Sequence, residues 1–313
     1  MAAGWRGAEL RLVGAGGEPA DLRRTLDSHG LTSLAPFRLE ETVPALEATL
    51  PQRRGAPRTV RISPGRAGHA RVELLGPAVS QAAGEALLAT VRHMLRLDED
   101  LSPFYALVEG DEALAWVATA GAGRLFRSPT VFEDVVKTIC TTNCAWSATV
   151  RMSSALVEHL GEPSPDGRRA FPAPAAMAAA DESFYRDAVR AGYRGAYLRS
   201  LAASVADGSL DLEALNGSDL ADDEVRDRLL ALPGVGPYAA AHVMILLGRY
   251  RPLVLDSWTR PRYAGLVNGG KPVPDARIDR AFARRYKRYA GLAFWLFLTR
   301  DWVPEEDNRQ QRP

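Results

Sequence analysis

The spacing of the apolar residues changes near residue 98, and this change is the strongest constraint on the fold. Before it, three short segments, near residue 8, from Arg58 and from His69, alternate apolar and polar side chains between Gly/Pro-rich turns. Such alternation is typical of half-buried strands. After it, apolar residues recur at helical spacing up to about residue 302. The sequence therefore predicts an α+β fold, with a mixed α+β unit at 1–98, a helical body at 99–302 and a polar tail at 303–313.

Capping signals refine the helices. Within the first unit, helices are expected over 21–30 and over about 80–97. Another helix is predicted from residue 131, because Thr130 can cap its N-terminus and Glu133 can reach back to the cap. This helix runs through Ile139 into the segment TTNC.

Charge and cysteine content narrow the function classes. The 313 residues include 39 Lys and Arg against 38 Asp and Glu, a formal net charge of +1. A polyanionic partner would therefore have to meet a local patch rather than a field of the whole molecule. Cys140 and Cys144 alone cannot build a four-thiolate cluster or a structural zinc site. No apolar run approaches the roughly 18 residues of a membrane span, so we expect a soluble, cytoplasmic protein that uses no membrane.

The segment LPGVGPYAAAHV carries the clearest chemical signal. An acidic amphipathic helix ends before a tight turn made by Gly234, Val235 and Gly236, and a second helix begins at Pro237. The first turn of a helix offers unpaired backbone N–H groups and the positive end of the helix dipole, which suit a phosphate oxygen. Glycine lets a nucleic-acid backbone approach closely. The hairpin is thus either a sequence-independent phosphate clamp or a plain helix–helix turn.

A carboxylate follows the hairpin at a defined distance. Asp256 lies eighteen residues beyond Tyr238, directly after the apolar run LVL. A helix of about three turns therefore separates the hairpin from this carboxylate at its far end. Asp256 alone would be interpreted as a cap for the segment SWTR. Paired with the hairpin at this distance, it is interpreted as a group with a chemical role.

These segments resemble the helix–hairpin–helix DNA glycosylases, which excise damaged bases. LPGVGPYAAAHV followed by VLDSWTRP is similar to the family's hairpin and aspartate. GRLFRSPTVFE at 123–133, ICTTN at 139–143 and GYRGAYL at 192–198 are similar to 8-oxoguanine DNA glycosylases, and their order is the family's. The resemblance covers roughly residues 120–265. It implies an antiparallel β subdomain before a helical glycosylase body, as in the 8-oxoguanine and 3-methyladenine II enzymes, and a monomer that binds damaged double-stranded DNA.

The resemblance also implies roles for single residues. Asp256 matches the catalytic aspartate, and Gly234 and Gly236 match the phosphate-binding hairpin. Asn143 and Arg194 match residues that enter the duplex where the flipped base leaves and contact the base opposite. The alternatives are a helix-end cap for Asn143 and a surface arginine on a phosphate for Arg194. Tyr193 lies beside Arg194 in the segment GYRGAYL and is expected to bind DNA together with Asn143 and Arg194.

The most telling departure from the family is Tyr238. Bifunctional members carry a lysine here, whose amine forms a Schiff base with the sugar and then cleaves the strand; a phenol cannot. The chain has only three lysines, Lys137, Lys271 and Lys287, and none lies in this segment. A monofunctional enzyme is therefore predicted, with Tyr238 stacking on an extruded base or buried in the core. Trp258 is a second pocket candidate, with a core position as its alternative.

Other departures concern substrate and cofactor. Ala148 stands where 8-oxoguanine enzymes carry a second arginine, which weakens strict recognition of 8-oxoguanine opposite cytosine. The four-cysteine cluster of endonuclease III is missing, so no iron–sulfur cluster and no required cofactor are expected; the resemblance allows a Na⁺ or K⁺ ion at the hairpin carbonyls. The expected substrate is an alkylated or oxidised purine. A non-catalytic hairpin DNA-binding protein and a bifunctional 8-oxoguanine glycosylase/lyase remain as alternatives.

Positive side chains gather in two places that could meet DNA or could be solvated faces. The segment 276–291 holds six basic residues against one acid: Arg277, Arg280, Arg284, Arg285, Lys287 and Arg288. A second candidate stripe consists of Arg186, Arg190, Arg194 and Arg199.

Overall fold

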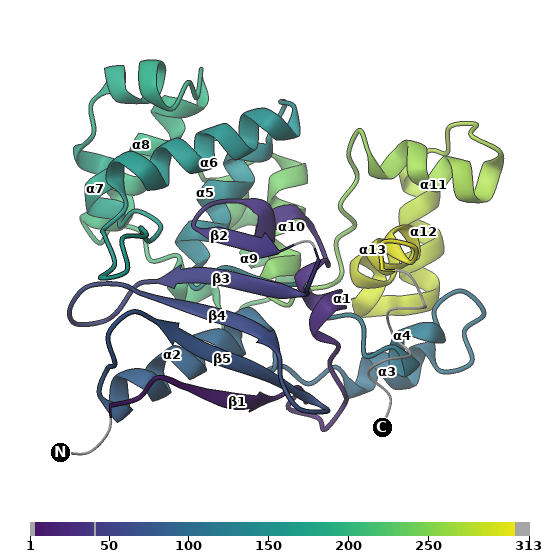
Figure 1. The fold of residues 1–313 in the computed structure, drawn as a ribbon. Helices are drawn as coiled ribbons and strands as arrows, with labels where there is room; N and C mark the ends of the chain where they lie inside the picture. The colour runs from purple at the N-terminus through teal and green to yellow at the C-terminus, as the bar shows by residue number, and fades with distance from the viewer. Residues whose placement is uncertain (1–3, 41, 304–313) are drawn as a thin grey trace.

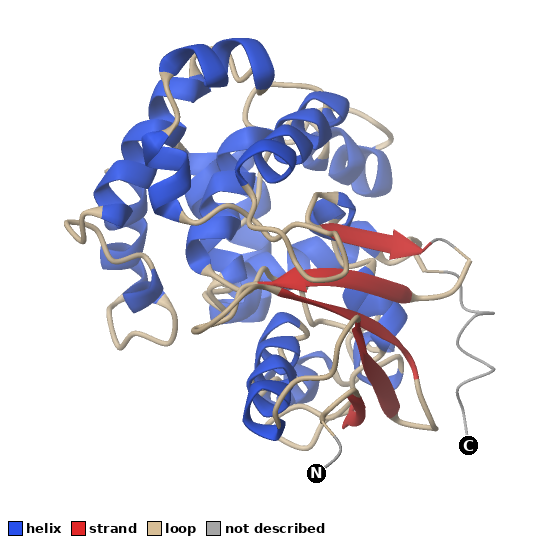
Figure 2. Cartoon of the chain, turned by 60° about the vertical axis from the view of Figure 1, so that its left-hand side comes forward, coloured by secondary structure: helices blue, strands red, loops and turns tan. Residues whose placement is uncertain are grey.

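The computed structural model describes residues 4–40 and 42–303. Five strands form one antiparallel sheet in the order β1-β5-β4-β3-β2: β1 (Gly7–Arg11), β2 (Phe37–Glu40), β3 (Ala45–Leu50), β4 (Arg58–Pro64) and β5 (His69–Leu75). The strands lie together on one side of the molecule, and the helices make up the rest (Figure 2). The predicted α+β fold, with the antiparallel sheet in the N-terminal part, is confirmed.

Strands β2 and β3 were not predicted. In β3 every residue is buried except Glu47, which is partly exposed, so the strand shows no alternation of apolar and polar side chains. A strand covered on both faces loses that pattern. Strand β2 has only four residues, of which Phe37 is buried.

Three helical segments belong to the first unit: α1 (Leu22–Leu26), the 3₁₀ helix η1 (Gly30–Ser33) and α2 (Gln81–Met94). The helix expected over 21–30 therefore ends early, at Leu26, and η1 begins only at Gly30. Helix α2 begins at its cap Ser80, whose hydroxyl accepts from the N–H of Ala83 at 3.3 Å. Its apolar face shares one core with the sheet, and Phe126 from the following part of the chain joins that core.

The remaining described chain is helical. Its elements are α3 (Ser102–Val108), α4 (Trp116–Thr119), α5 (Val131–Thr141), α6 (Trp146–Leu160), α7 (Pro174–Ala179), η2 (Phe184–Ala188), α8 (Arg194–Ala206), η3 (Glu213–Leu215), α9 (Asp222–Leu230), α10 (Pro237–Leu246), α11 (Thr259–Asn268), α12 (Asp275–Tyr286), η4 (Lys287–Tyr289) and α13 (Ala290–Thr299). In Figure 1, α5–α8 lie at the upper left and α11–α13 at the right, with α10 between them.

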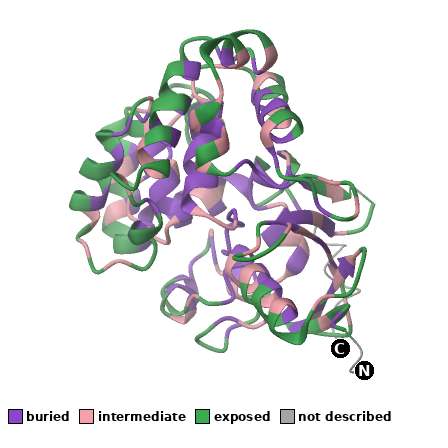
Figure 3. Ribbon diagram, turned by 90° about the vertical axis from the view of Figure 1, so that its left-hand side faces the viewer, coloured by how far each residue is buried: buried purple, intermediate pink, exposed green. Residues whose placement is uncertain are grey.

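Helix α10 is the shared wall of two apolar cores. Ala240 and Val243 belong to the core of α5, α6, α8 and α9, whereas Ala241 and Ile245 belong to the core of α3, α12 and α13. A helix that is apolar all round is buried, and seven of the ten residues of α10 are buried. The buried segments, purple in Figure 3, gather toward the centre of the molecule. Tyr238, in the first turn of α10, packs against both cores. The hairpin helix therefore starts where the two groups of helices meet.

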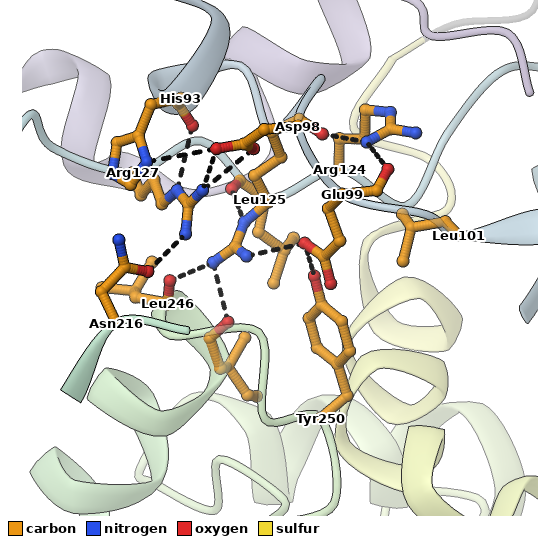
Figure 4. Close-up of polar contacts among 12 residues, drawn as sticks. His93, Asp98, Glu99, Leu101, Arg124, Leu125, Arg127, Asn216, Leu246 and Tyr250 are labelled. Atoms are coloured by element: carbon orange, nitrogen blue, oxygen red, sulfur yellow. Dashed lines mark hydrogen bonds and ion pairs between the residues drawn. The ribbon is translucent and has the colours of Figure 1, made fainter. Parts of the chain in front are cut away.

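A buried charged cluster joins the first unit to the helical body (Figure 4). The Arg96 side chain is fully buried and donates to the carbonyls of Leu125 and Ile245 at 2.6 and 2.9 Å. It also pairs with Glu99 at 2.9 Å, and Glu99 accepts from the Tyr250 hydroxyl at 2.8 Å. Buried charged groups are normally paired and hydrogen-bonded, and each nitrogen of the Arg96 guanidinium has such a partner.

None of the helices described in residues 4–40 and 42–303 is both long enough and apolar enough to cross a membrane. Of the polar tail predicted at 303–313, only Val303 is described, and it is buried. The other tail residues lie outside the described residues.

Candidate active site and DNA-facing surface

The hairpin between α9 and α10 has the predicted form. Gly234 has φ +81°, and a Cβ there would come within 2.7 Å of the Tyr197 ring, so only glycine fits. Val235 is buried, and its N–H donates to the Leu232 carbonyl at 3.1 Å, which closes the turn. Gly236 is the N-cap of α10, is exposed and makes no side-chain cap, so the first-turn N–H groups remain available for an anion.

The half-buried carboxylate of Asp256 caps α11. Its Oδ1 accepts from the N–H groups of Trp258 and Thr259 at 2.8 and 2.7 Å, and the Thr259 hydroxyl accepts from the N–H of Asp256 at 2.8 Å. Within the described residues, Oδ2 accepts no hydrogen bond. The capping interpretation thus describes one oxygen of the carboxylate and leaves the other open for chemistry.

Asp256 influences the pKa values of two side chains in the first two turns of α10. Burial lowers the pKa of His242 to about 4, and the Asp256 carboxylate partly opposes that shift. Burial raises the pKa of Tyr238, and the same carboxylate adds to the shift. The Tyr238 ring lies 6.1 Å from that of His242, and its hydroxyl is 3.3 Å from that of Thr141. The Asp256 carboxylate is thus close enough to the start of α10 to influence the pKa values of both side chains.

Two histidines that sequence reasoning missed complete this cluster. His29, which caps η1, donates from Nε2 to the Phe126 carbonyl at 2.5 Å and accepts at Nδ1 from the N–H of Leu31. Burial lowers the pKa of His29 to about 3, and its ring meets His242 edge-on at 6.0 Å. His242 Nδ1 is buried without a partner among the described residues. Helical spacing from Tyr238 could have pointed to His242, whereas nothing local marks His29.

Trp258 is not a core residue. Its side chain is 39% exposed, and its ring lies 5.8 Å from Trp295 and 5.5 Å from Trp302. The Trp295 indole N–H donates to the Ser28 carbonyl at 2.8 Å, which anchors the three rings to the first unit. Trp258, two residues after Asp256, therefore belongs to a cluster of three aromatic rings that is partly exposed.

Helix α5 confirms one half of its predicted capping box. The Thr130 hydroxyl accepts from the N–H of Glu133 at 3.2 Å, as expected. The Glu133 side chain does not reach back; it is buried and pairs with Lys137 at 2.6 Å. The Lys137 ammonium is fully buried and lies 3.7 Å from the centre of the Phe37 ring in β2. Burial raises the pKa of Glu133 and lowers that of Lys137. Each buried charge is stabilised by the opposite charge of the other, so Glu133 pairs with Lys137 instead of reaching back to the N-terminus of α5.

Asn143 and Tyr193 form an exposed pair beyond the end of α5. Asn143 has φ +47° and donates from Nδ2 to the Tyr193 hydroxyl at 3.3 Å, and the Tyr193 side chain is 55% exposed. Arg194, expected at the surface or at the opposite base, is only 7% exposed and donates to Thr142. The surface position is therefore wrong for Arg194, whereas contact with the opposite base stays a prediction. The exposed members of the second basic stripe are Arg186, Arg190 and Arg199.

The first basic patch spans α12 and η4. Arg277, Arg280 and Arg284 are exposed on this helix, and Arg285 pairs with the buried Asp111 at 2.8 Å. Among the described residues, no group of three or more His, Cys, Asp or Glu side chains could hold a metal ion.

The chain is similar to known proteins in sequence and in fold. No protein-family model matches the chain. The probable N-glycosylase/DNA lyase of Methanothermobacter thermautotrophicus is 25% identical over 231 residues, which cover 66% of this chain and 72% of that protein. The 3-methyladenine DNA-glycosylase from Archaeoglobus fulgidus has a similar structure, with a TM-score of 0.70, 20% identity, and 96% and 99% of the two chains covered.

A second solved structure contains double-stranded DNA. The Clostridium acetobutylicum 8-oxoguanine glycosylase/lyase, in complex with double-stranded DNA containing cytosine opposite 8-oxoguanine, matches with a TM-score of 0.72 and 18% identity. The match covers 95% of this chain and 96% of that one. The chain therefore has the fold of these 3-methyladenine and 8-oxoguanine DNA glycosylases and is similar in sequence to a probable N-glycosylase/DNA lyase.

Proposed function

We propose that the chain is a monofunctional DNA glycosylase that hydrolyses the N-glycosidic bond of a damaged purine extruded from duplex DNA. The observation that carries the proposal is the state of Asp256. One carboxylate oxygen is fixed by two backbone N–H groups, and the other accepts no hydrogen bond from the described residues. The clostridial protein of similar fold binds double-stranded DNA with a damaged purine, which supports the same class of substrate here.

The chemistry follows from the charge on this carboxylate. The glycosidic bond of a purine breaks as the sugar gains oxocarbenium character, so a fixed anion near the anomeric carbon lowers the barrier. Asp256 Oδ2 can also orient or deprotonate the attacking water. Because Oδ1 is held by the start of α11, the carboxylate needs no rearrangement before it acts.

Base release without strand cleavage is supported by the groups near the hairpin. Tyr238 occupies the position from which a lysine would form a Schiff base, and a phenol cannot form one. Lys137 is fully buried and paired with Glu133, while Lys271 and Lys287 are exposed outside the hairpin. Borohydride should therefore trap no covalent adduct between the protein and DNA. A trapped adduct would favour the bifunctional alternative. The similar proteins of Methanothermobacter thermautotrophicus and Clostridium acetobutylicum are described as a probable N-glycosylase/DNA lyase and a glycosylase/lyase, which is in line with that alternative.

An alkylated, cationic purine is the substrate class that the cluster suits best. Aromatic faces such as those of Tyr238 and Trp258 attract cations. Burial keeps His29 and His242 neutral at pH 7, so neither imidazole repels a positively charged base. The glycosidic bond of such a base is already weakened. An oxidised purine is the second candidate, because the clostridial structure contains one.

The proposed DNA contacts come from several elements. The N–H groups in the first turn of α10, after Gly236, would bind a phosphate of the DNA. A Na⁺ or K⁺ ion bound to the hairpin carbonyls would bind the same phosphate. Asn143 and Tyr193 would fill the gap that the extruded base leaves. Exposed arginines on α12 would lie along the phosphate backbone. The protein would act as a monomer.

The decisive experiment measures base release from duplexes that contain 3-methyladenine, 8-oxoguanine, hypoxanthine or uracil. We expect release of the alkylated purine and loss of release in Asp256→Asn, with duplex affinity near wild type. Retained DNA binding without release from any duplex would support the non-catalytic alternative. Unchanged turnover in Asp256→Asn would exclude this residue as the catalytic carboxylate.

A further inference from the structure

Each nitrogen of the Arg194 guanidinium has an acceptor inside the protein. Nε donates to the Thr142 carbonyl at 3.0 Å, and Nη2 donates to the same oxygen. Nη1 lies 3.4 Å from the Ala191 carbonyl, and the Thr142 hydroxyl is 3.3 Å from Nε. The planar fork of an arginine is suited to one acceptor held by two donors, and here that acceptor is a backbone oxygen.

The acceptor, the Thr142 carbonyl, belongs to the residue directly before Asn143. Thr142 is the C-cap of α5, where backbone carbonyls lack helical partners and the helix dipole favours a positive charge. The next residue, Asn143, turns into the left-handed region with φ +47° and is exposed. Arg194 therefore stabilises the backbone turn that projects the Asn143 side chain.

The same guanidinium also holds Tyr193. It lies 4.5 Å from the centre of the Tyr193 ring, whose hydroxyl accepts from Asn143 Nδ2. Tyr193 meets Tyr197 edge-on at 5.9 Å, and Tyr197 packs against Gly234 in the hairpin. The two exposed side chains are thus fixed both to each other and to the phosphate-binding turn.

We propose that Arg194 is a positioning residue that holds Asn143 and Tyr193 as one preassembled wedge, and that it does not read the base opposite the lesion. This inference rests on the proposed base-excision function. An Arg194 side chain that swung out to the opposite base would leave the Thr142 carbonyl without its donors and would release the Tyr193 ring. The wedge therefore works best while Arg194 stays buried.

The test compares Arg194→Met with wild type under single-turnover conditions. The substrates carry the lesion that wild type excises, placed opposite each of the four normal bases, opposite an abasic site, and in a single strand. We expect Arg194→Met to slow release by a common factor of about tenfold or more opposite every normal base. Release from the single strand and opposite the abasic site should change far less, because no paired base must be displaced there.

Asn143→Ala should show the same pattern, and the double variant should lose little more than either single variant because the residues act as a unit. Arg199→Met, which removes an exposed arginine from the same helix, should leave the ratio of paired to unpaired substrate unchanged. A loss confined to one opposite base, or equal losses on paired and unpaired substrates, would overturn the inference. Arg194→Lys keeps the charge without the fork and replaces Arg194→Met if that variant does not fold.

A second readout does not depend on base release. A 2-aminopurine beside the lesion brightens when a side chain unstacks it, and we expect a slower and smaller rise with Arg194→Met. If wild type unstacks the probe but releases no base, the proposed enzyme activity fails while the wedge is still tested. Insertion by Arg194→Met at the wild-type rate would overturn the wedge inference alone.

Discussion

Tyr238 and Thr141 meet through their hydroxyl groups at 3.3 Å, which ties the first turn of α10 to the end of α5. Because Thr141 gives its own proton to the Thr138 carbonyl at 2.7 Å, the Tyr238 hydroxyl is the donor of this pair. Tyr238→Phe should therefore lower the free energy of unfolding by about 1 kcal/mol. It should leave base release near wild type, since the ring remains. Tyr238→Ala is the matched loss of the ring, and equal release rates for the two variants would contradict a stacking role.

Asp256 combines a cap with a chemical role, and substitutions can separate the two. Asparagine can still accept from the N–H groups of Trp258 and Thr259, so Asp256→Asn should unfold in urea within a few tenths of a kcal/mol of wild type. Asp256→Ala should lose about 1 kcal/mol of stability. Both should lose base release. Activity that followed stability across the two variants would contradict catalysis by this group.

The two hairpin glycines should respond differently to alanine. Gly234→Ala places a Cβ against the Tyr197 ring at a position with φ +81°, so we expect a loss of about 1–3 kcal/mol. Gly236 has no atom within 4 Å of an added Cβ, so Gly236→Ala should fold with little change. Its added methyl would obstruct the approach of a phosphate, and duplex affinity should fall. Equal duplex affinity for wild type and Gly236→Ala would contradict phosphate binding at this turn.

The buried histidines should make the protein less stable in mild acid. The pKa values of His29 and His242 are lowered from 6.5 to about 3 and about 4, mainly by burial. Below pH 6.5 the unfolded chain therefore binds protons that the folded chain does not, and the free energy of unfolding falls as the pH drops toward 4. Urea unfolding at pH 7 and pH 5 would measure this fall. His242→Gln should show a smaller fall than wild type, and identical slopes would contradict the burial of a neutral imidazole.

The pair of Lys137 and Glu133 should matter more when it is broken than when it is removed. Lys137→Met leaves a buried carboxyl without its partner, so we expect a loss of about 3–5 kcal/mol. Replacing both residues by methionine should recover much of that loss, because two apolar chains of similar volume need no partner. Chemical denaturation of the two variants and wild type gives the comparison. A double variant as unstable as Lys137→Met would show that the pair itself stabilises the fold.

Local signals predicted the parts of the molecule that depend on neighbouring residues. The hairpin of Gly234–Gly236, the cap at Thr130 and the capping alternative for Asp256 follow from residue types within four positions of one another. The three alternating strands were predicted for the same reason. Strand β3 was missed because both its faces are covered, which erases the alternation.

Contacts between distant segments were not predictable. His29 reaches His242 across more than two hundred residues, and the sequence contains no pattern that links them. The direction of Arg194 also depends on a distant group, since the Thr142 carbonyl that holds it belongs to another helix. A family resemblance supplied the positions of both Arg194 and Asn143. The orientation of Arg194 could come only from the structure.

Arg96 precedes the change of periodicity near residue 98, yet its guanidinium lies among carbonyls at 125 and 245. The change at residue 98 is therefore a change of secondary structure and not a line along which the protein can be divided. A helical body taken from a relative would be compatible with this first unit only if it offered carbonyl oxygens and a carboxylate in the same places to the same arginine.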